Sequence, residues 1–91
     1  MLVPGKLYQL NCSDLGWGNF MMRDDSEDWN SLPTVPLPLG AIILVVECLI
    51  MEGLNINVES VLGVRFIYGN HVYKTKRSIA NLKAYFIEYS G

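Results

Sequence analysis

The sequence has little of the residues on which most catalytic and metal sites depend. It contains two cysteines and one histidine among 91 residues, and only 18% of its residues are charged. Cys12 and Cys48 are too few for a disulfide framework and too far apart for a chelating pair, so we expect them to be reduced and buried. His71 has no cysteine or second histidine near it at ligand spacing, which favours a structural role.

Signatures of catalysis and of cofactor binding are also missing. No sequence context activates the cysteines or the histidine as a nucleophilic constellation. Gly16-Trp17-Gly18 lacks the further glycine and the following helix of a phosphate-binding loop. In the acidic run 24–30, Trp29 stands where a calcium loop needs glycine, and Val35 stands where it needs glutamate. We therefore expect a protein that is not an enzyme and that holds no metal or cofactor.

The sequence does not indicate a membrane span or a secretory leader. The longest apolar stretch, from Leu39 to Met51, is interrupted by Glu47 and is shorter than the ~17–25 residues that cross a bilayer. Residues 1–6 do not show a basic start followed by an apolar run, as a secretory signal does. We therefore expect a cytoplasmic protein with no membrane partner.

Apolar residues are plentiful. Hydrophobic residues make up 51% of the chain and aromatic residues 11%, which excludes a disordered chain and is enough for one folded domain over residues 1–91. The net charge of −2 argues against a uniformly basic surface. The acids cluster over residues 24–28, however, and most of the bases follow residue 64. A local basic face is therefore compatible with the composition.

The first half of the chain predicts short strands, a long loop and one strong strand. Leu7–Asn11 follows a Pro-Gly turn and is a strand candidate, and Trp17–Met22 is a weaker extended segment. Residues 24–40 combine the acidic run with most of the prolines, which excludes a helix and favours an extended loop. Ala41–Met51 is rich in β-branched residues and is the strongest predicted strand.

The second half predicts a hairpin, a helical turn and a last strand. Leu62–Tyr68 and His71–Arg77 are separated by Gly69-Asn70, a pair typical of a tight turn in which glycine takes a positive φ. Residues 78–83 are expected to form a short helical turn whose first residue, a serine, is its N-cap. Residues 84–89 then return as a strand.

These elements predict an all-β fold. We expect a small, strongly bent, five-stranded barrel of the Src-homology-3-like or Sm-like class. It has a long loop between early strands and a short helical turn before the last strand. Closure of the barrel would let a short chain bury its apolar strand faces without leaving long sheet edges exposed.

The two-residue turn fixes which residues of the hairpin lie opposite one another. We expect the side that pairs aromatic residues to face the core. Its opposed pairs are Tyr68 with His71, Phe66 with Tyr73, Val64 with Thr75 and Leu62 with Arg77. The other side pairs Arg65 with Lys74 and continues to Lys76, and two opposed cations are unfavourable unless an anion or a carboxylate lies between them. This side is either an ordinary solvated face or a surface that follows nucleic-acid phosphates.

Both faces of the strand over residues 41–51 are apolar, whereas a small barrel buries only one of them. We expect Ile43, Val45, Leu49 and Met51 to point outward, where each side chain forfeits ~1.5–3 kcal/mol if it is left in water. Two coverings are open. One is the loop over residues 29–39, through Leu32, Val35 and Leu37, and the other is a second copy of the protein.

The segment Ile67-Tyr68-Gly69-Asn70-His71-Val72 resembles the second signature segment of the Sm and Lsm RNA-binding proteins. In that segment an apolar residue, arginine, glycine, asparagine, any residue and an apolar residue follow one another, and Tyr68 replaces the arginine. The resemblance implies a small bent barrel, a ring assembled through strand edges, and single-stranded RNA at the pore of the ring. It implies base stacking at Tyr68, a base-edge contact at Asn70 and close backbone approach at Gly69.

These observations predict a non-catalytic binding module that forms a homo-oligomer and binds single-stranded RNA or DNA. The expected nucleic-acid-binding residues supply stacking surface, close backbone approach and phosphate neutralisation. They are Arg65, Tyr68, Gly69, Asn70, Lys74, Lys76 and Arg77. The alternative is a protein-interaction or assembly module, in which the apolar strand or the proline-rich loop contacts a protein and the basic hairpin is only solvated.

Overall fold

The computed structural model describes residues 2–11, 20–26, 28–29, 34–52 and 60–90 of the chain. These residues form seven β-strands and one short α-helix, so the prediction of a mainly β fold is confirmed. In chain order the elements are β1 (Leu7–Leu10), β2 (Met21–Asp24), β3 (Val35–Pro36), β4 (Ile42–Glu52), β5 (Val61–Tyr68), β6 (His71–Ser78), α1 (Ile79–Tyr85) and β7 (Phe86–Glu88).

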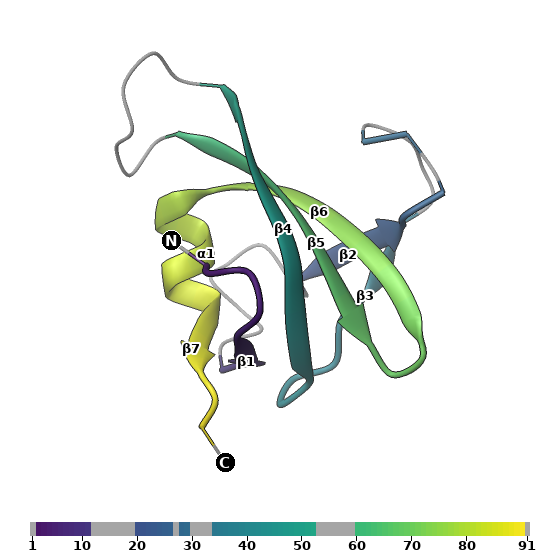
Figure 1. Ribbon diagram of the computed structural model, residues 1–91, viewed down its shortest axis with the longest axis vertical. Helices are drawn as coiled ribbons and strands as arrows, with labels where there is room; N and C mark the ends of the chain where they lie inside the picture. The colour runs from purple at the N-terminus through teal and green to yellow at the C-terminus, as the bar shows by residue number, and fades with distance from the viewer. Residues whose placement is uncertain (1, 12–19, 27, 30–33, 53–59, 91) are drawn as a thin grey trace.

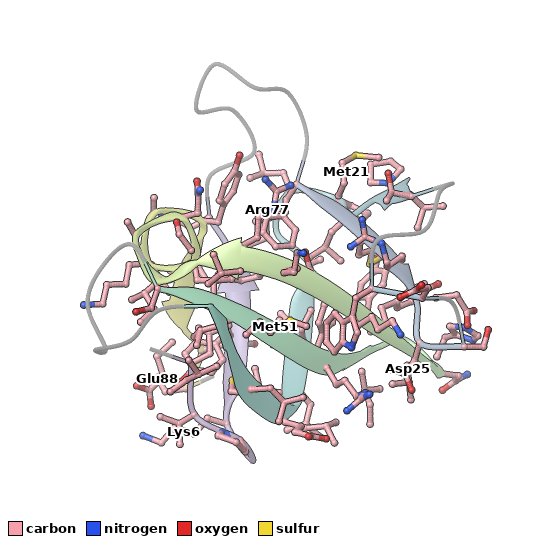
Figure 2. All side chains as sticks on the ribbon, turned by 90° about the horizontal axis from the view of Figure 1, so that it is seen from above. Lys6, Met21, Asp25, Met51, Arg77 and Glu88 are labelled. Atoms are coloured by element: carbon pink, nitrogen blue, oxygen red, sulfur yellow. The ribbon has the colours of Figure 1, made fainter. Side chains whose placement is uncertain are left out.

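The strands form one curled antiparallel sheet with the order β3-β2-β6-β5-β4-β1-β7. Figure 1 shows the sheet wrapped into a half-barrel, with α1 and β7 beside β1 and with β2 and β3 at the other side. The prediction of a closed, five-stranded barrel is wrong, because among the described residues the edge strands β3 and β7 do not pair with each other. One additional strand is β3, inside the predicted loop, where Pro36 is tolerated because it lies at a sheet edge.

Most of the predicted strands are found within one residue of their predicted ends. This holds for β1, β4, β5 and β6. The predicted extended segment 17–22 overlaps β2 only at its end, and residues 17–19 lie outside the described residues. The strand predicted over residues 84–89 is shortened to β7, because the preceding helix is longer than the predicted turn.

A β-bulge interrupts the alternation of β4 between the inside and the outside of the sheet. Val45 lies opposite Phe66, and Glu47 lies opposite Arg65, the next residue back along β5. Val46 is therefore an extra residue with no partner of its own. Such a bulge bends the strand that carries it and increases its local twist.

The prediction that Ile43 and Val45 face outward is wrong. Both side chains are 1% exposed and lie in the core, because they share the inward face of the sheet with Phe66. The prediction extended a strict period of two along the whole strand, whereas the bulge changes the phase at Val46. Leu49 and Met51, beyond the bulge, are exposed as predicted.

The predicted cover of β4 by the loop over residues 29–39 is not formed by the apolar residues proposed for it. Leu37 is buried in the core, where its backbone N–H donates to the carbonyl of Phe20 at 2.8 Å. Val35 is exposed in β3, and Leu32 lies outside the described residues. The residue of this loop that does cover the outside of the sheet is Trp29, described below.

The β5–β6 hairpin has the predicted register. Tyr68 lies opposite His71, and the pairing continues without a shift to Val61 opposite Ser78. Gly69 has a φ of 63°, and no described non-glycine residue has a positive φ. A positive φ at the first turn residue alone is the pattern of a type II′ turn, which only glycine adopts readily. The core-facing side is also as predicted, since Leu62, Val64, Phe66 and Thr75 are buried.

The helix α1 packs against the inner side of the curl and carries Ile79, Leu82 and Tyr85 into the core. Its N-cap is Ser78, as predicted, and the Ser78 hydroxyl oxygen accepts the Asn81 backbone N–H at 3.2 Å. Phe20, which directly precedes β2, packs edge-on against Tyr85 and Phe86, with ring centroids 4.9 and 5.0 Å away. The helix thus fills the side of the half-barrel where β1 and β7 lie (Figure 1).

Candidate interaction surface

The convex, outer face of the sheet carries the side chains that point away from the core. Its rows follow from the strand register, because residues directly opposite each other in an antiparallel pair share a face. One row runs from Leu7 through Leu44 and Ile67 to Val72, across β1, β4, β5 and β6. A parallel row joins Ile87 of β7 and Ile42 of β4, which both lie opposite Gln9 of β1.

The apolar residues of these two rows form one surface, which we call the apolar band, and Gln9 lies between Ile42 and Ile87 in the second row. It consists of Leu7, Ile42, Leu44, Ile67, Val72 and Ile87. Leu7 is 42% exposed, Ile42 39%, Val72 37% and Ile87 46%, while Leu44 and Ile67 are partly buried between them. Full burial of such a side chain contributes ~1.5–3 kcal/mol, so leaving two fifths of it in water forgoes about 1 kcal/mol at each position.

The next row of the same face is charged rather than apolar. Glu47, Arg65, Lys74 and Arg23 lie opposite one another across β4, β5, β6 and β2, and we call them the charged row. The Arg65 guanidinium donates to a carboxylate on each side, through Nε to Asp25 and through Nη1 to Glu47, both at 2.9 Å. These two hydrogen bonds raise the pKa of Arg65 above its ordinary value.

The predicted clash between Arg65 and Lys74 is relieved by the acidic run. The Asp25 carboxylate accepts from Arg65, and the Asp25 carbonyl accepts from the Lys74 ammonium at 3.1 Å. Lys74 is only 5% exposed. A buried ammonium is unfavourable unless it is hydrogen-bonded, and every buried side-chain nitrogen or oxygen of the described residues has a partner.

The Trp29 indole covers the charged row. The Lys74 ammonium lies 4.8 Å and the Arg65 guanidinium carbon 5.4 Å from the ring centroid, within cation–π distance. The ring rests on Gly63, where a Cβ atom would lie 2.9 Å from Trp29 Cη2 and 2.6 Å from Met51 Sδ. Glycine is therefore what allows the indole to approach the sheet so closely.

The hairpin tip is tied to the same acidic run. His71 Nε2 contacts an Asp24 carboxylate oxygen, and the other carboxylate oxygen accepts from both the hydroxyl and the backbone N–H of Ser26. These hydrogen bonds, those from Ser26 first, lower the pKa of Asp24 from 3.8 to about 2. Gly69 and Asn70 are exposed at the tip itself.

The predicted nucleic-acid-binding residues lie on two different faces. Arg65, Lys74 and Lys76 are on the outer face, whereas Tyr68 and Arg77 are on the inner side of the ribbon. Tyr68 packs against the core, and the Arg77 guanidinium carbon lies 5.1 Å from the centroid of the Phe20 ring. Lys76 also takes part in an interaction within the chain. The register thus brings the outer cations together and separates them from Tyr68.

Sequence reasoning missed two parts of this surface. Leu7 and Ile87 extend the apolar band beyond β4, and the alternation of β1 was the signal that Leu7 and Tyr8 point to opposite faces. Nothing in the sequence, however, pairs β1 with β4. The contact of Trp29 with Gly63 was also missed, because the two residues are far apart in the chain and no local pattern links them.

The remaining candidates for reactive chemistry are the metal-ligating side chains and the cysteine in the described part of the chain. No group of three or more histidine, cysteine or acidic side chains there is arranged to hold a metal ion. Cys48 is a free, half-buried thiol whose Sγ lies 3.2 Å from the carbonyl oxygen of Leu2. Burial raises the pKa of this thiol. Cys12 lies outside the described residues.

Comparisons of the chain with protein-family models, with curated protein sequences and with solved structures find no match. The resemblance of residues 67–72 to the Sm and Lsm proteins stays a prediction. Among the described helices, none combines the length and the apolar character that a membrane crossing requires.

Proposed function

We propose that the chain is a non-catalytic protein-interaction module whose binding surface is the apolar band. The observation that carries this proposal is the exposure of apolar side chains from five neighbouring strands on one face of the sheet. Contiguous apolar patches on a soluble protein are typical of interaction sites.

The electrostatics of the outer face favour an apolar partner over an anionic one. Arg65 is already hydrogen-bonded to Asp25 and Glu47, and Lys74 is buried beneath Trp29. A phosphate group would have to displace these partners before it gained anything from either cation. The net charge of −2 gives no long-range attraction to a polyanion.

The sheet edges favour binding through the face. The edge strands β3 and β7 are two and three residues long, and β3 contains Pro36. Short edge strands and proline are features that prevent pairing with another chain. A partner therefore gains more from the apolar band than from strand addition at either edge.

Site-specific photo-crosslinking tests this proposal. Benzoylphenylalanine is placed at Ile42, inside the apolar band, or at Leu39, which is 63% exposed but outside it, and the chain is irradiated in an extract of its native cells. We expect protein adducts from position 42 that position 39 does not form. Equal adducts from both positions, or none from position 42, would overturn the proposal.

Single-stranded nucleic-acid binding within an Sm-like barrel is the second candidate. The observation that favours it is the exposed Gly69-Asn70 tip between two well-paired strands, as the Sm resemblance requires. Titration of a labelled oligonucleotide at two salt concentrations tests it. Binding that weakens steeply with salt and with Lys76→Glu supports nucleic-acid recognition, and no binding at low salt removes this candidate.

A further inference from the structure

We propose that the second half of β4 is a strand-addition site for an extended segment of another protein. The added segment lies beside residues 47–50 and in line with β1, so that it continues the sheet. This inference goes beyond the proposed function, because it concerns an open strand edge and not the apolar band. It is carried by two observations: backbone groups of β4 that face no strand, and a rise in side-chain exposure where β1 ends.

β1 covers only the first half of β4. Its last backbone contacts are made with Val45, whose N–H donates to the Lys6 carbonyl at 3.1 Å and whose carbonyl accepts from the Gly5 N–H at 2.8 Å. Beyond Val45, β5 is the only strand of the described residues that pairs with β4. Figure 1 shows β4 and β5 extending together past the end of β1. Among the described residues, the side of β4 that faces away from β5 therefore has no neighbouring strand over residues 46–52.

The strand register identifies the backbone groups at this edge. Successive residues of a strand direct their N–H and C=O groups to opposite sides, and the extra residue Val46 shifts this alternation by one. Because Val45 faces β1, Cys48 and Ile50 are the next residues whose groups point away from β5. The Leu2 carbonyl accepts from the Cys48 thiol at 3.2 Å, and no backbone hydrogen bond joins these groups to another described residue. An extended backbone is the ligand that pairs with such a row.

Side-chain exposure on the inner face changes where β1 ends. Ile43 and Val45, which have a strand on both sides, are each 1% exposed. Ile50 shares this face with Leu62, but Ile50 is 51% exposed whereas Leu62 is completely buried. Leu62 has β4 on one side and β6 on the other, while Ile50 has only β5. A strand added to the edge covers Ile50 as β1 covers Ile43.

The open edge lacks the features that protect the two ends of the sheet. Residues 46–52 contain no proline, glycine or lysine, whereas β3 is only two residues long and contains Pro36. A strand edge without such protection accepts another strand. The two register shifts of β4 limit the site, because only residues 47–50 pair one to one with β5 between them. The added strand is therefore short, and we expect a weak, reversible complex.

The side chains of residues 47–50 define the chemistry of the added segment. In antiparallel addition, as with β1, residues opposite each other share a face of the sheet. Leu49 and Ile50 are 39% and 51% exposed, so apolar residues are favoured opposite both. The Glu47 carboxylate is 44% exposed, and Arg65 donates to one of its two oxygens, so a lysine or arginine is favoured opposite it. The segment therefore has two apolar residues, any residue and a basic residue, in that order.

A second copy of β4 does not provide this pattern. Residues 46–52 include no lysine or arginine, so β4 paired with itself places no cation opposite Glu47. We therefore assign the open edge to a different protein, and the experiments below distinguish the two occupants.

Amide hydrogen exchange of the purified full-length chain, followed by NMR, tests whether the edge is open. We expect the Cys48 and Ile50 N–H groups to exchange at least ~10-fold faster than the Leu49 N–H, which points to β5. Equal protection of the three amides at low protein concentration would overturn the inference. Protection of Cys48 and Ile50 that rises with the concentration of the chain alone would assign the edge to a second copy instead.

Selection of short random peptides displayed on phage tests the chemistry of the partner. We expect enriched peptides to carry the predicted pattern and to slow the exchange of the Cys48 and Ile50 amides. Methylation of the peptide N–H opposite Ile50 should weaken binding at least ~10-fold, because it removes a hydrogen bond to β4. Methylation of the next peptide N–H, which points away from β4, should have little effect. Enrichment of no peptide, or equal effects of the two methyl groups, would contradict strand addition.

A substitution in the chain locates the bound peptide. Ile50→Lys should weaken binding of a selected peptide at least ~10-fold, because it removes an apolar contact and places a cation beside the added strand. Leu39→Lys is the matched control, since it makes the same change at a position that is 63% exposed and distant in sequence from the open edge. Equal weakening by the two variants would contradict the proposed site.

The inference and the proposed function can fail separately. Specific photo-adducts at position 42 without peptide binding at the edge would remove this inference alone. Peptide binding that protects the Ile50 amide, without specific adducts at position 42, would support the inference and remove the proposed role of the apolar band.

Discussion

The outer face of the sheet has two halves that differ in what lies over them. Over the charged row, the chain supplies its own cover: Trp29 lies on Gly63, and Asp25 hydrogen-bonds to both cations. Over the apolar band, side chains such as Ile42 and Ile87 remain more than a third exposed. The two halves share β4, β5 and β6, so their difference does not come from these strands alone.

The chain neutralises the charged row with its own Asp25, whereas side chains of the apolar band stay exposed. A charged row without Asp25 would hold opposed cations at short range, which destabilises a sheet. The exposed side chains of the apolar band cost stability more mildly, and that cost is recovered when they are buried by another molecule. The predictions below therefore change one half of the face at a time.

The largest effect on stability is expected from removing the Trp29 indole, which covers the charged row. Trp29→Ala should lower the free energy of unfolding by ~2–3 kcal/mol, somewhat less than for a fully buried tryptophan, because the indole is partly exposed. The loss comes from the packing of the indole on Gly63 and from the two cation–π contacts with Lys74 and Arg65. Urea denaturation measures it. Ile42→Ala, in the uncovered half, is the matched comparison, and an equal loss there would contradict the distinction between the halves.

Removing the shared cation should have a smaller effect. Arg65→Met keeps most of the side-chain volume but leaves the Asp25 and Glu47 carboxylates without their common donor. We expect a loss of about 1–2 kcal/mol at neutral pH, less than for a buried ion pair because these groups are partly exposed. Thermal or urea denaturation checks it. Lys83→Met, an exposed lysine on α1, is the control and should change stability little.

The contact between the Asp24 carboxylate and His71 at the hairpin tip should make the stability of the fold depend on pH. The pKa of Asp24 is lowered from 3.8 to about 2, so its ionised form is favoured by folding. This contribution is present above pH 3.8 and is lost as the pH falls from about 4 through 2. Denaturation midpoints measured over this range should fall less steeply in Asp24→Asn. A profile unchanged from the wild type would show that the Ser26 and His71 contacts are not formed in solution.

The smallest effect is expected in the apolar band. Val72→Thr replaces one methyl group with a hydroxyl at a position that is 37% exposed. We expect the free energy of unfolding to change by less than ~0.5 kcal/mol, as for other surface substitutions. The measurement is made at low protein concentration, so that contacts between molecules do not contribute. A large loss would show that this half of the face is needed for folding.

Local features of the fold could be predicted from the sequence, because their determinants lie within a few residues. Gly69-Asn70 fixed the hairpin register, and Ser78 marked the start of the helix. The expectation that an anion or a carboxylate lies between Arg65 and Lys74 is met in part, since the Asp25 carboxylate accepts from Arg65 and the Asp25 backbone carbonyl accepts from Lys74. In each case the inference used only the spacing of neighbouring residues or a pairing already fixed by the turn.

Features that depend on distant segments could not be predicted. The pairing of β1 with β4 extends the apolar band, but nothing in the sequence of either strand identifies the other as its partner. The bulge at Val46 leaves no mark in a strand in which almost every residue is apolar, so the phase of its two faces was assigned wrongly for Ile43 and Val45. The placement of Trp29 depends on the space above Gly63, which exists only after the sheet has formed.

The extra residue at Val46 affects the bend of β4 but not the side of the sheet on which each of its other side chains lies. Because Val46 has no partner on β5, a chain that lacked it would keep Val45 opposite Phe66 and Glu47 opposite Arg65. Every other side chain of the strand would stay on its present side of the sheet. What would be lost is the local bend, and a flatter sheet would enclose less volume for Phe20 and the helix. Val46 thus contributes to the curl of the half-barrel, together with the second register shift between Ile50 and Glu52, and leaves the inside and the outside of the sheet unchanged.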